Sequence, residues 1–266
     1  MAFVIASAYR DTILDEYKDE FGTALKLWKL PTTGEPSRDM AFSNFTEANF
    51  TGYSQQTTAY QASVISGDAA YTLSDTELFQ RTSGATDNDV YGLLGYYDAD
   101  EVAGAMLSDT PRAMEECGDA ILANVKVWLK DTGDGDWMFT NELMKRIVAA
   151  FKPYRIHLFK NDATPATDSV IGDFAECDFP GYASSTFSCW TEAALDGNTA
   201  YIESCVVSWT ATGDSDPSQS VYGYYLTDSG GSYIGAKKFD TPVDMSDLND
   251  NHAQKVKLSL TNPVTA

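Results

Sequence analysis

The chain has 266 residues, enough for two ordinary domains with separate cores. Its content of 43% hydrophobic and 21% charged residues is typical of a globular protein. The net charge of −21 disfavours direct nucleic-acid binding, because an acidic surface repels phosphate, and it would suit a basic partner surface. No apolar run approaches the roughly 18 residues of a membrane span, so we expect no membrane insertion.

The N-terminal residues and the cysteines give no sign of a secreted, disulfide-rich protein. Residues 1–6 are apolar but lack a basic segment before them, and Arg10 follows closely, which predicts no signal peptide. The four cysteines show no Cys-x-x-Cys spacing, and we expect buried, reduced thiols. They are Cys117, Cys177, Cys189 and Cys205.

Two segments have the apolar spacing of an amphipathic helix. Residues 3–21 and 138–151 each carry a large apolar side chain at every fourth position, which predicts one buried face. Gly22 and Pro153 are natural stops. The stripes consist of Ile5, Tyr9, Ile13, Tyr17 and Phe21, and of Phe139, Leu143, Ile147 and Phe151.

A ten-residue motif follows each predicted helix and the strand-like run after it. It occupies residues 44–53 and 173–182, and five of its ten positions are identical. The identical pairs are Phe45 and Phe174, Glu47 and Glu176, Phe50 and Phe179, Gly52 and Gly181, and Tyr53 and Tyr182. We expect both Phe rings in the core, the Gly at a tight or positive-φ bend, and the Tyr hydroxyl at a strand edge.

A longer repeat relates residues 90–129 to residues 221–260 at a constant shift of 131. Thirteen of these forty positions are identical, whereas composition alone predicts about two or three. An internal duplication is therefore expected, with a first copy at 1–131 and a second at 132–266. The predicted fold is mainly β: two tandem β-sandwich or small-barrel domains, each preceded by one α-helix.

Candidate sites for metals and cofactors are weak. His157 and His252 do not recur between the copies, and no His/Cys ligand spacing surrounds them. The acidic linker at 130–136 resembles a calcium loop, but its ligand spacing is wrong. No nucleotide-binding loop or nucleophile elbow is present, so we expect no metal, no cofactor and no catalytic residue.

The repeated glutamates Glu47 and Glu176 allow two interpretations. A glycosidase needs two carboxylates about 5 or 9 Å apart in one cleft, but each copy supplies a single recurring Glu. We favour a structural carboxylate that accepts backbone N–H bonds where the chain turns before Gly-Tyr. An aromatic ligand box at the motif is the less favoured alternative, and the repeated Asp-Thr-Pro at 109–111 and 240–242 is expected to be a turn.

The second copy carries a series of short motifs in a fixed order. They are Leu158-Phe159-Lys160-Asn161, Asn161-Asp162-x-x-Pro165, Asp173-Phe174-x-Glu176, Phe179-Pro180-Gly181-Tyr182-Ala183 and Val221-Tyr222-Gly223-Tyr224. In these motifs the copy resembles a class of small virion proteins of tailed bacteriophages. The resemblance covers most of residues 138–262. The first copy departs from it, with Leu27-Trp28-Lys29-Leu30 in place of Leu-Phe-x-Asn. The resemblance implies a non-enzymatic structural protein of the virion.

We therefore expect a capsid decoration or cement protein that binds the major capsid protein across shell subunits, together with other virion proteins. Two linked modules raise the effective concentration of each contact. We also expect a homo-oligomer, assembled in the host cytoplasm and not secreted. The alternatives are a tail, neck or baseplate component, and a carbohydrate-binding domain on the virion.

Overall fold

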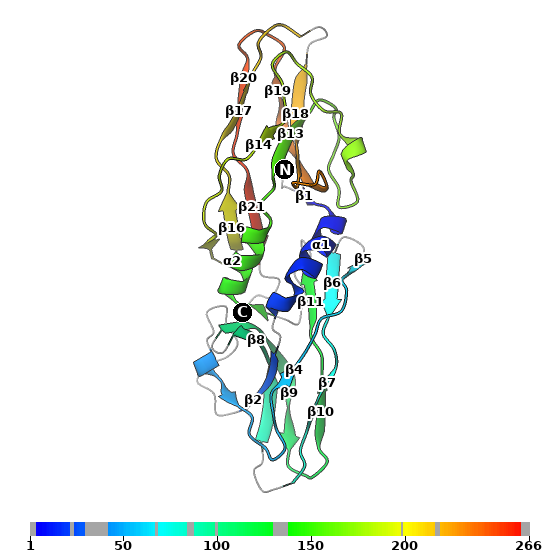
Figure 1. Cartoon of the computed structure of the whole chain (residues 1–266), viewed down its shortest axis with the longest axis vertical. Helices are drawn as coiled ribbons and strands as arrows, with labels where there is room; N and C mark the ends of the chain where they lie inside the picture. The colour runs from blue at the N-terminus through cyan, green and yellow to red at the C-terminus, as the bar shows by residue number, and fades with distance from the viewer. Residues whose placement is uncertain are drawn as a thin grey trace. The chain divides into compact units, whose positions relative to one another are not determined.

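The structure is a computed structural model that describes residues 4–21, 24–29, 42–66, 69–83, 88–98, 101–129, 138–197, 199–215 and 219–261 (Figure 1). The described chain is mainly β, with two α-helices and several antiparallel sheets, which confirms the β-rich fold class. Its contacts divide it into two compact units. Unit 1 comprises Met1–Arg10, Val148–Ala194 and Tyr201–Ser259. Unit 2 comprises Asp11–Ile147, Leu195–Ala200 and Leu260–Ala266.

Both predicted helices are present but shorter than expected. Helix α1 spans Ser7–Tyr17 and continues as a 3-10 turn over Lys18–Phe21, and α2 spans Asn141–Ala150. The Thr140 hydroxyl accepts the Leu143 N–H at 3.2 Å and caps the start of α2. The residues before the helices are strands instead: β1 is Val4–Ile5 and β12 is Met138–Phe139.

The main sheet of unit 2 has six strands. Its order is β12-β9-β8-β2-β3, and β4 also pairs with β2. The strands after β12 are β9 (Glu101–Met114), β8 (Asn88–Asp98), β2 (Ala24–Lys29), β3 (Thr46–Glu47) and β4 (Gln56–Thr57). Leu93 and Leu94 of β8 are both buried, so this central strand is apolar on both faces.

The main sheet of unit 1 has five strands in the order β1-β19-β18-β13-β14 (Figure 1). The strands after β1 are β19 (Tyr233–Asp244), β18 (Ser220–Thr227), β13 (Arg155–Phe159) and β14 (Ser185–Thr186). Its register matches that of unit 2: Trp28 lies opposite Gly92, and Phe159 lies opposite Gly223.

The smaller sheets also occur in matching sets. The two-stranded ribbons are β7 (Glu77–Gln80) with β10 (Ala120–Ala123), and β17 (Val207–Thr210) with β20 (Asn251–Gln254), each drawn side by side in Figure 1. One three-stranded sheet is β11 (Lys126–Leu129), β6 (Ala69–Leu73) and β5 (Val64–Ser66). The other is β15 (Ala194–Asp196), β16 (Thr199–Glu203) and β21 (Lys257–Thr261).

The compact units differ from the predicted domain limits, 1–131 and 132–266, at Met1–Arg10, at residues 132–147, and at Leu195–Ala200 and Leu260–Ala266. The short N-terminal strands explain the first two differences. β1 pairs with β19 through Val4 and Ala236, so the first residues of the chain belong to unit 1. β12 pairs with β9 through Met138 and Ala105, so these residues belong to unit 2. The physical reason is that β9 and β19 would otherwise present unpaired backbone groups at the edge of their sheets.

The Asp-Thr-Pro segments are not turns, which corrects the expectation from sequence. Both lie within long strands, β9 and β19. Between Val221 and Gly223 the partner positions move from Val243 to Lys238, so two steps on β18 correspond to five on β19. The extra residues form a bulge, which accommodates Pro242 because a bulged position needs no N–H for the ladder.

The cysteines also differ from the prediction. Cys189 and Cys205 form a disulfide with Cα atoms 5.5 Å apart, and Cys117 is exposed. Only Cys177 fits the expected buried thiol, and burial raises its pKa to about 12. Cysteine spacing did not predict the disulfide, because pairing of the two segments in the folded chain brings the cysteines together. The Cys205 N–H donates to the Cys189 carbonyl at 3.1 Å.

Candidate functional site

The repeated motif forms a sharp corner in each unit. Gly52 has a φ of 92° and Gly181 a φ of 90°, which confirms the expected positive-φ bend. A Cβ atom at Gly181 would lie 2.8 Å from the Thr210 carbonyl oxygen, so the corner also packs closely against the end of β17. Both features restrict the position to glycine.

In unit 1 this bend places Tyr182 against the carboxylate of Glu176. The Tyr182 hydroxyl donates to Oε1 of Glu176 at 2.8 Å and accepts the N–H of Leu158 at 3.0 Å. Nδ1 of His157 lies 2.9 Å from the same carboxylate oxygen, and the Tyr225 hydroxyl donates to Oε2 at 3.2 Å. We call this group the Glu176 corner.

The electrostatics of the Glu176 corner favour a charged carboxylate. Burial opposes ionisation, but hydrogen bonds from His157 and Tyr182 outweigh it, and the pKa of Glu176 lies below its ordinary value. Burial and the adjacent Glu176 raise the pKa of Tyr182, which therefore stays protonated and acts as a donor. The imidazole of His157 stacks on Tyr225, with ring centroids 4.5 Å apart.

In unit 2 the same positions form the Glu47 corner, with Lys26 in place of His157. The Tyr53 hydroxyl donates to Oε1 of Glu47 at 3.0 Å and accepts the Leu27 N–H at 3.1 Å. The ammonium of Lys26 lies 3.0 Å from Oε2 of Glu47 and 4.8 Å from the ring centroid of Tyr96. The carboxylate thus has a cationic partner here.

The structural interpretation of the two glutamates needs one change. We expected them to accept backbone N–H bonds, but the partners in the described structure are side chains, chiefly a tyrosine in each unit. The Tyr hydroxyl binds the backbone instead, at Leu27 and at Leu158. The tyrosine therefore links the carboxylate to the strand before it.

The two Phe positions of the motif lie in the cores, as expected. Phe45 contacts Trp28 at a centroid distance of 5.5 Å, and Phe174 contacts Phe159 at 5.0 Å. Phe50 and Phe179 are each 2% exposed and lie edge-on to the motif tyrosine. The five motif residues of each copy are thus brought together within one unit.

The histidines lie in different surroundings. His252 packs against Trp209 and Phe239, and burial lowers its pKa. His157 belongs to the Glu176 corner. Among the described residues, no group of three or more His, Cys, Asp or Glu side chains is arranged to hold a metal ion. The acidic linker lies outside the described residues.

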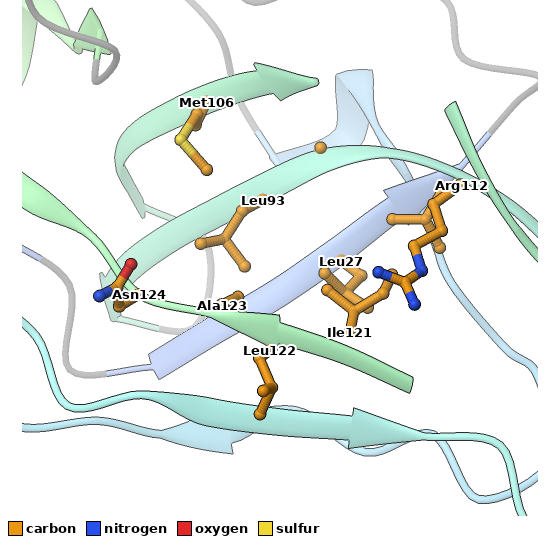
Figure 2. A pocket seen from close by; sticks show the side chains of 10 residues that line it. Leu27, Leu93, Met106, Arg112, Ile121, Leu122, Ala123 and Asn124 are labelled. Atoms are coloured by element: carbon orange, nitrogen blue, oxygen red, sulfur yellow. The ribbon is translucent and has the colours of Figure 1, made fainter. Parts of the chain in front are cut away.

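Unit 2 contains a pocket of about 270 Å³ between the main sheet and β10, which we call the β10 pocket (Figure 2). Leu27 and Leu93 form a buried wall, whereas Leu122 is 71% exposed at the rim. Figure 2 shows Arg112 and Asn124 at opposite ends. The lining residues are Leu27, Val90, Gly92, Leu93, Met106, Arg112, Ile121, Leu122, Ala123 and Asn124.

The β10 pocket could not be predicted from the identities between the two repeats, because its distinguishing residues do not recur. The signal lay in the differences. Leu93 aligns with Tyr224 at the shift of 131, and Arg112 aligns with Val243. Where one repeat has a smaller or a charged residue at a position that is aromatic or apolar in the other, a cavity can remain.

Comparison with protein-family models, with curated proteins and with solved structures finds no match to this chain. Neither described helix has the length and apolar content needed to cross a membrane.

Proposed function

We propose that the chain is a tandem duplication of one β-rich unit and acts as a non-enzymatic structural protein of a phage virion. In this proposal it decorates the capsid, binding the outer shell across subunits of the major capsid protein. The observation that carries the proposal is the motif corner. The residues behind the phage resemblance hold the same strand-to-strand link in both units, through Glu176 and Tyr182 and through Glu47 and Tyr53.

Matching details support the duplication. Gly118 and Asn249, which align at the shift of 131, are both at positive φ, at 98° and 71°. The ammonium of Lys126 lies 3.9 Å from the Tyr71 ring centroid, and that of Lys257 lies 3.8 Å from Tyr201. Agreement of backbone, register and side-chain contact is what two copies of one ancestral unit would retain.

The binding role is supported by charge and by valency. A net charge of −21 suits a basic receptor surface, and two linked units can each make a modest contact while the pair binds tightly. A decoration protein needs a stable scaffold with a partner surface, and the motif side chains are used for internal packing and hydrogen bonding.

Cryo-electron microscopy of intact virions of the phage whose genome encodes the chain tests this proposal. We expect density for the two β-rich units on the outer shell, bridging capsid subunits. A sixfold or twelvefold ring at the neck or tail would favour the alternative of a tail component. Virions that contain the protein nowhere would overturn both.

A further inference from the structure

The β10 pocket has features that a structural role of the chain does not use. Its volume of about 270 Å³ lies near the lower end of small-ligand pockets, and a cavity of about 150 Å³ already holds benzene. We propose that the β10 pocket is a binding site for a small aromatic carboxylate, a single ring carrying a short acidic side chain. This inference does not depend on the virion assignment.

The preference for an aromatic ring comes from the corresponding region of unit 1. There Phe239 lies 6.0 Å from the ring of Tyr224 and 5.2 Å from that of His252, measured between ring centroids. The aligned residues of the first copy are Ser108, Leu93 and Ile121. Unit 1 thus fills the space beside its β18 and β20 with rings of its own.

Unit 2 keeps the same backbone without these rings. Leu27 pairs with Leu93 as Leu158 pairs with Tyr224, so the sheet register is unchanged. The ribbon register is also retained, since Ile121 lies opposite Phe79 and His252 lies opposite Trp209. Because the strands pair in the same register but carry smaller side chains, they leave a space that the aromatic ring of a ligand could fill.

The preference for a carboxylate comes from Arg112. Its side chain is exposed and lines the pocket together with Leu27 and Ile121, at the end that Figure 2 shows opposite Asn124. No hydrogen bond or ion pair within 4.0 Å joins this guanidinium to another residue of the part that the structure describes. Asp119, which it attracts at longer range, already accepts the N–H groups of Glu115 and Glu116.

A pocket lined by apolar side chains and one arginine is well suited to a ligand that has both an apolar ring and a negative charge. The wall takes the ring, and the planar guanidinium binds a carboxylate through two parallel N–H bonds. A single cation and the limited volume disfavour a polyphosphate or a nucleotide. The aligned residue in unit 1 is Val243, so this anchor is specific to unit 2.

The test uses the full chain, labelled at its methionine methyl groups, because Met106 lines the pocket. The probes are 3-phenylpropionate and its uncharged counterpart 3-phenyl-1-propanol. We expect 3-phenylpropionate to shift the Met106 signal saturably. Arg112→Met should weaken its binding about tenfold and leave that of the alcohol unchanged, whereas the control Arg155→Met should affect neither.

A second variant tests the place of binding. Leu93→Tyr introduces the residue of unit 1 and should abolish the Met106 shift with both probes. Ala123→Leu should do the same from the opposite wall, and an unchanged signal of the buried Met245 reports an intact unit 1. The proposal is overturned if Met106 does not respond to 3-phenylpropionate, if both filled variants still bind it, or if Arg112→Met binds it as tightly as the native chain.

Discussion

The ring of Phe159 lies so close to Gly223 that a Cβ atom at residue 223 would fall 2.5 Å from the ring Cζ atom. The two residues face each other across the paired strands β13 and β18. Trp28 and Gly92 stand in the same relation in unit 2, where the Trp28 Nε1 atom would be 2.5 Å away. At both places a cross-strand carbonyl oxygen, of Lys237 or of Met106, would be nearer still at 2.2 Å, so the ring and the neighbouring backbone together leave room only for glycine.

Gly223→Ala should destabilise the chain. The added methyl group would lie 2.2 Å from the Lys237 carbonyl oxygen and 2.5 Å from the buried ring of Phe159, and overpacking of this kind costs about 1–3 kcal/mol. Urea unfolding followed by circular dichroism measures the loss. Gly172→Ala is the matched control, because nothing lies within 4 Å of its added Cβ, and it should be near neutral.

Gly181→Ala should cost more than a positive φ alone explains. Its φ is 90°, and the new Cβ would also lie 2.8 Å from the Thr210 carbonyl oxygen. We expect a loss of about 3 kcal/mol. Gly231→Ala has a φ of 86° but open space around the Cβ, so it should lose only about 1 kcal/mol. Equal losses in the two variants would contradict the close packing of the motif corner.

Glu176→Gln should weaken the chain at neutral pH and make less difference in acid. The pKa of Glu176 is lowered on folding, so its contribution is complete above its ordinary value of 4.5 and is lost as the pH falls through the folded pKa. Because the side chain is 40% exposed, we expect only about 1 kcal/mol at pH 7. The measurement is the free energy of unfolding of both proteins between pH 7 and pH 3.

Glu192→Gln, at an exposed position, serves as the control for this pH series and should leave the free energy of unfolding unchanged at every pH. A difference between native chain and Glu176→Gln that stays constant down to pH 3 would show that the carboxylate charge is not what the corner uses.

Removal of the Cys189–Cys205 disulfide should destabilise unit 1. The bridge spans 16 residues, and closing a loop of this length contributes about 3 kcal/mol through the unfolded state. The double variant Cys189→Ala/Cys205→Ala should lower the urea midpoint, and added reductant should then have no further effect on it. Cys117→Ala, at an exposed free thiol, should leave the midpoint unchanged.

The sequence was informative where structure is local. Periodic apolar residues located both helices, and the motif predicted the positive φ of Gly52 and Gly181 and the buried Phe rings. It failed where partners are distant along the chain. Nothing near Val4 indicates that it pairs with Ala236, and nothing near Cys189 indicates that Cys205 lies opposite. These contacts depend on sheet assembly, which periodicity does not encode.

For the candidate sites, too, the sequence identified single residues but not their distant partners. Glu176 was identified because it repeats, but its partners His157 and Tyr225 come from two other strands and could not be read from spacing. Arg112 and Leu93 drew no attention because they do not repeat. A pocket that arises where Leu93 and Ile121 replace the rings of Tyr224 and His252 can be recognised only by comparison with the other unit.

The most direct test of the central claim is the number of chains per virion, measured by quantitative mass spectrometry of purified particles against the major capsid protein. Decoration of the shell predicts a copy number comparable to that of the capsid protein. A count of only about six or twelve, as a ring in the tail would give, or absence from the particle, would contradict the decoration role.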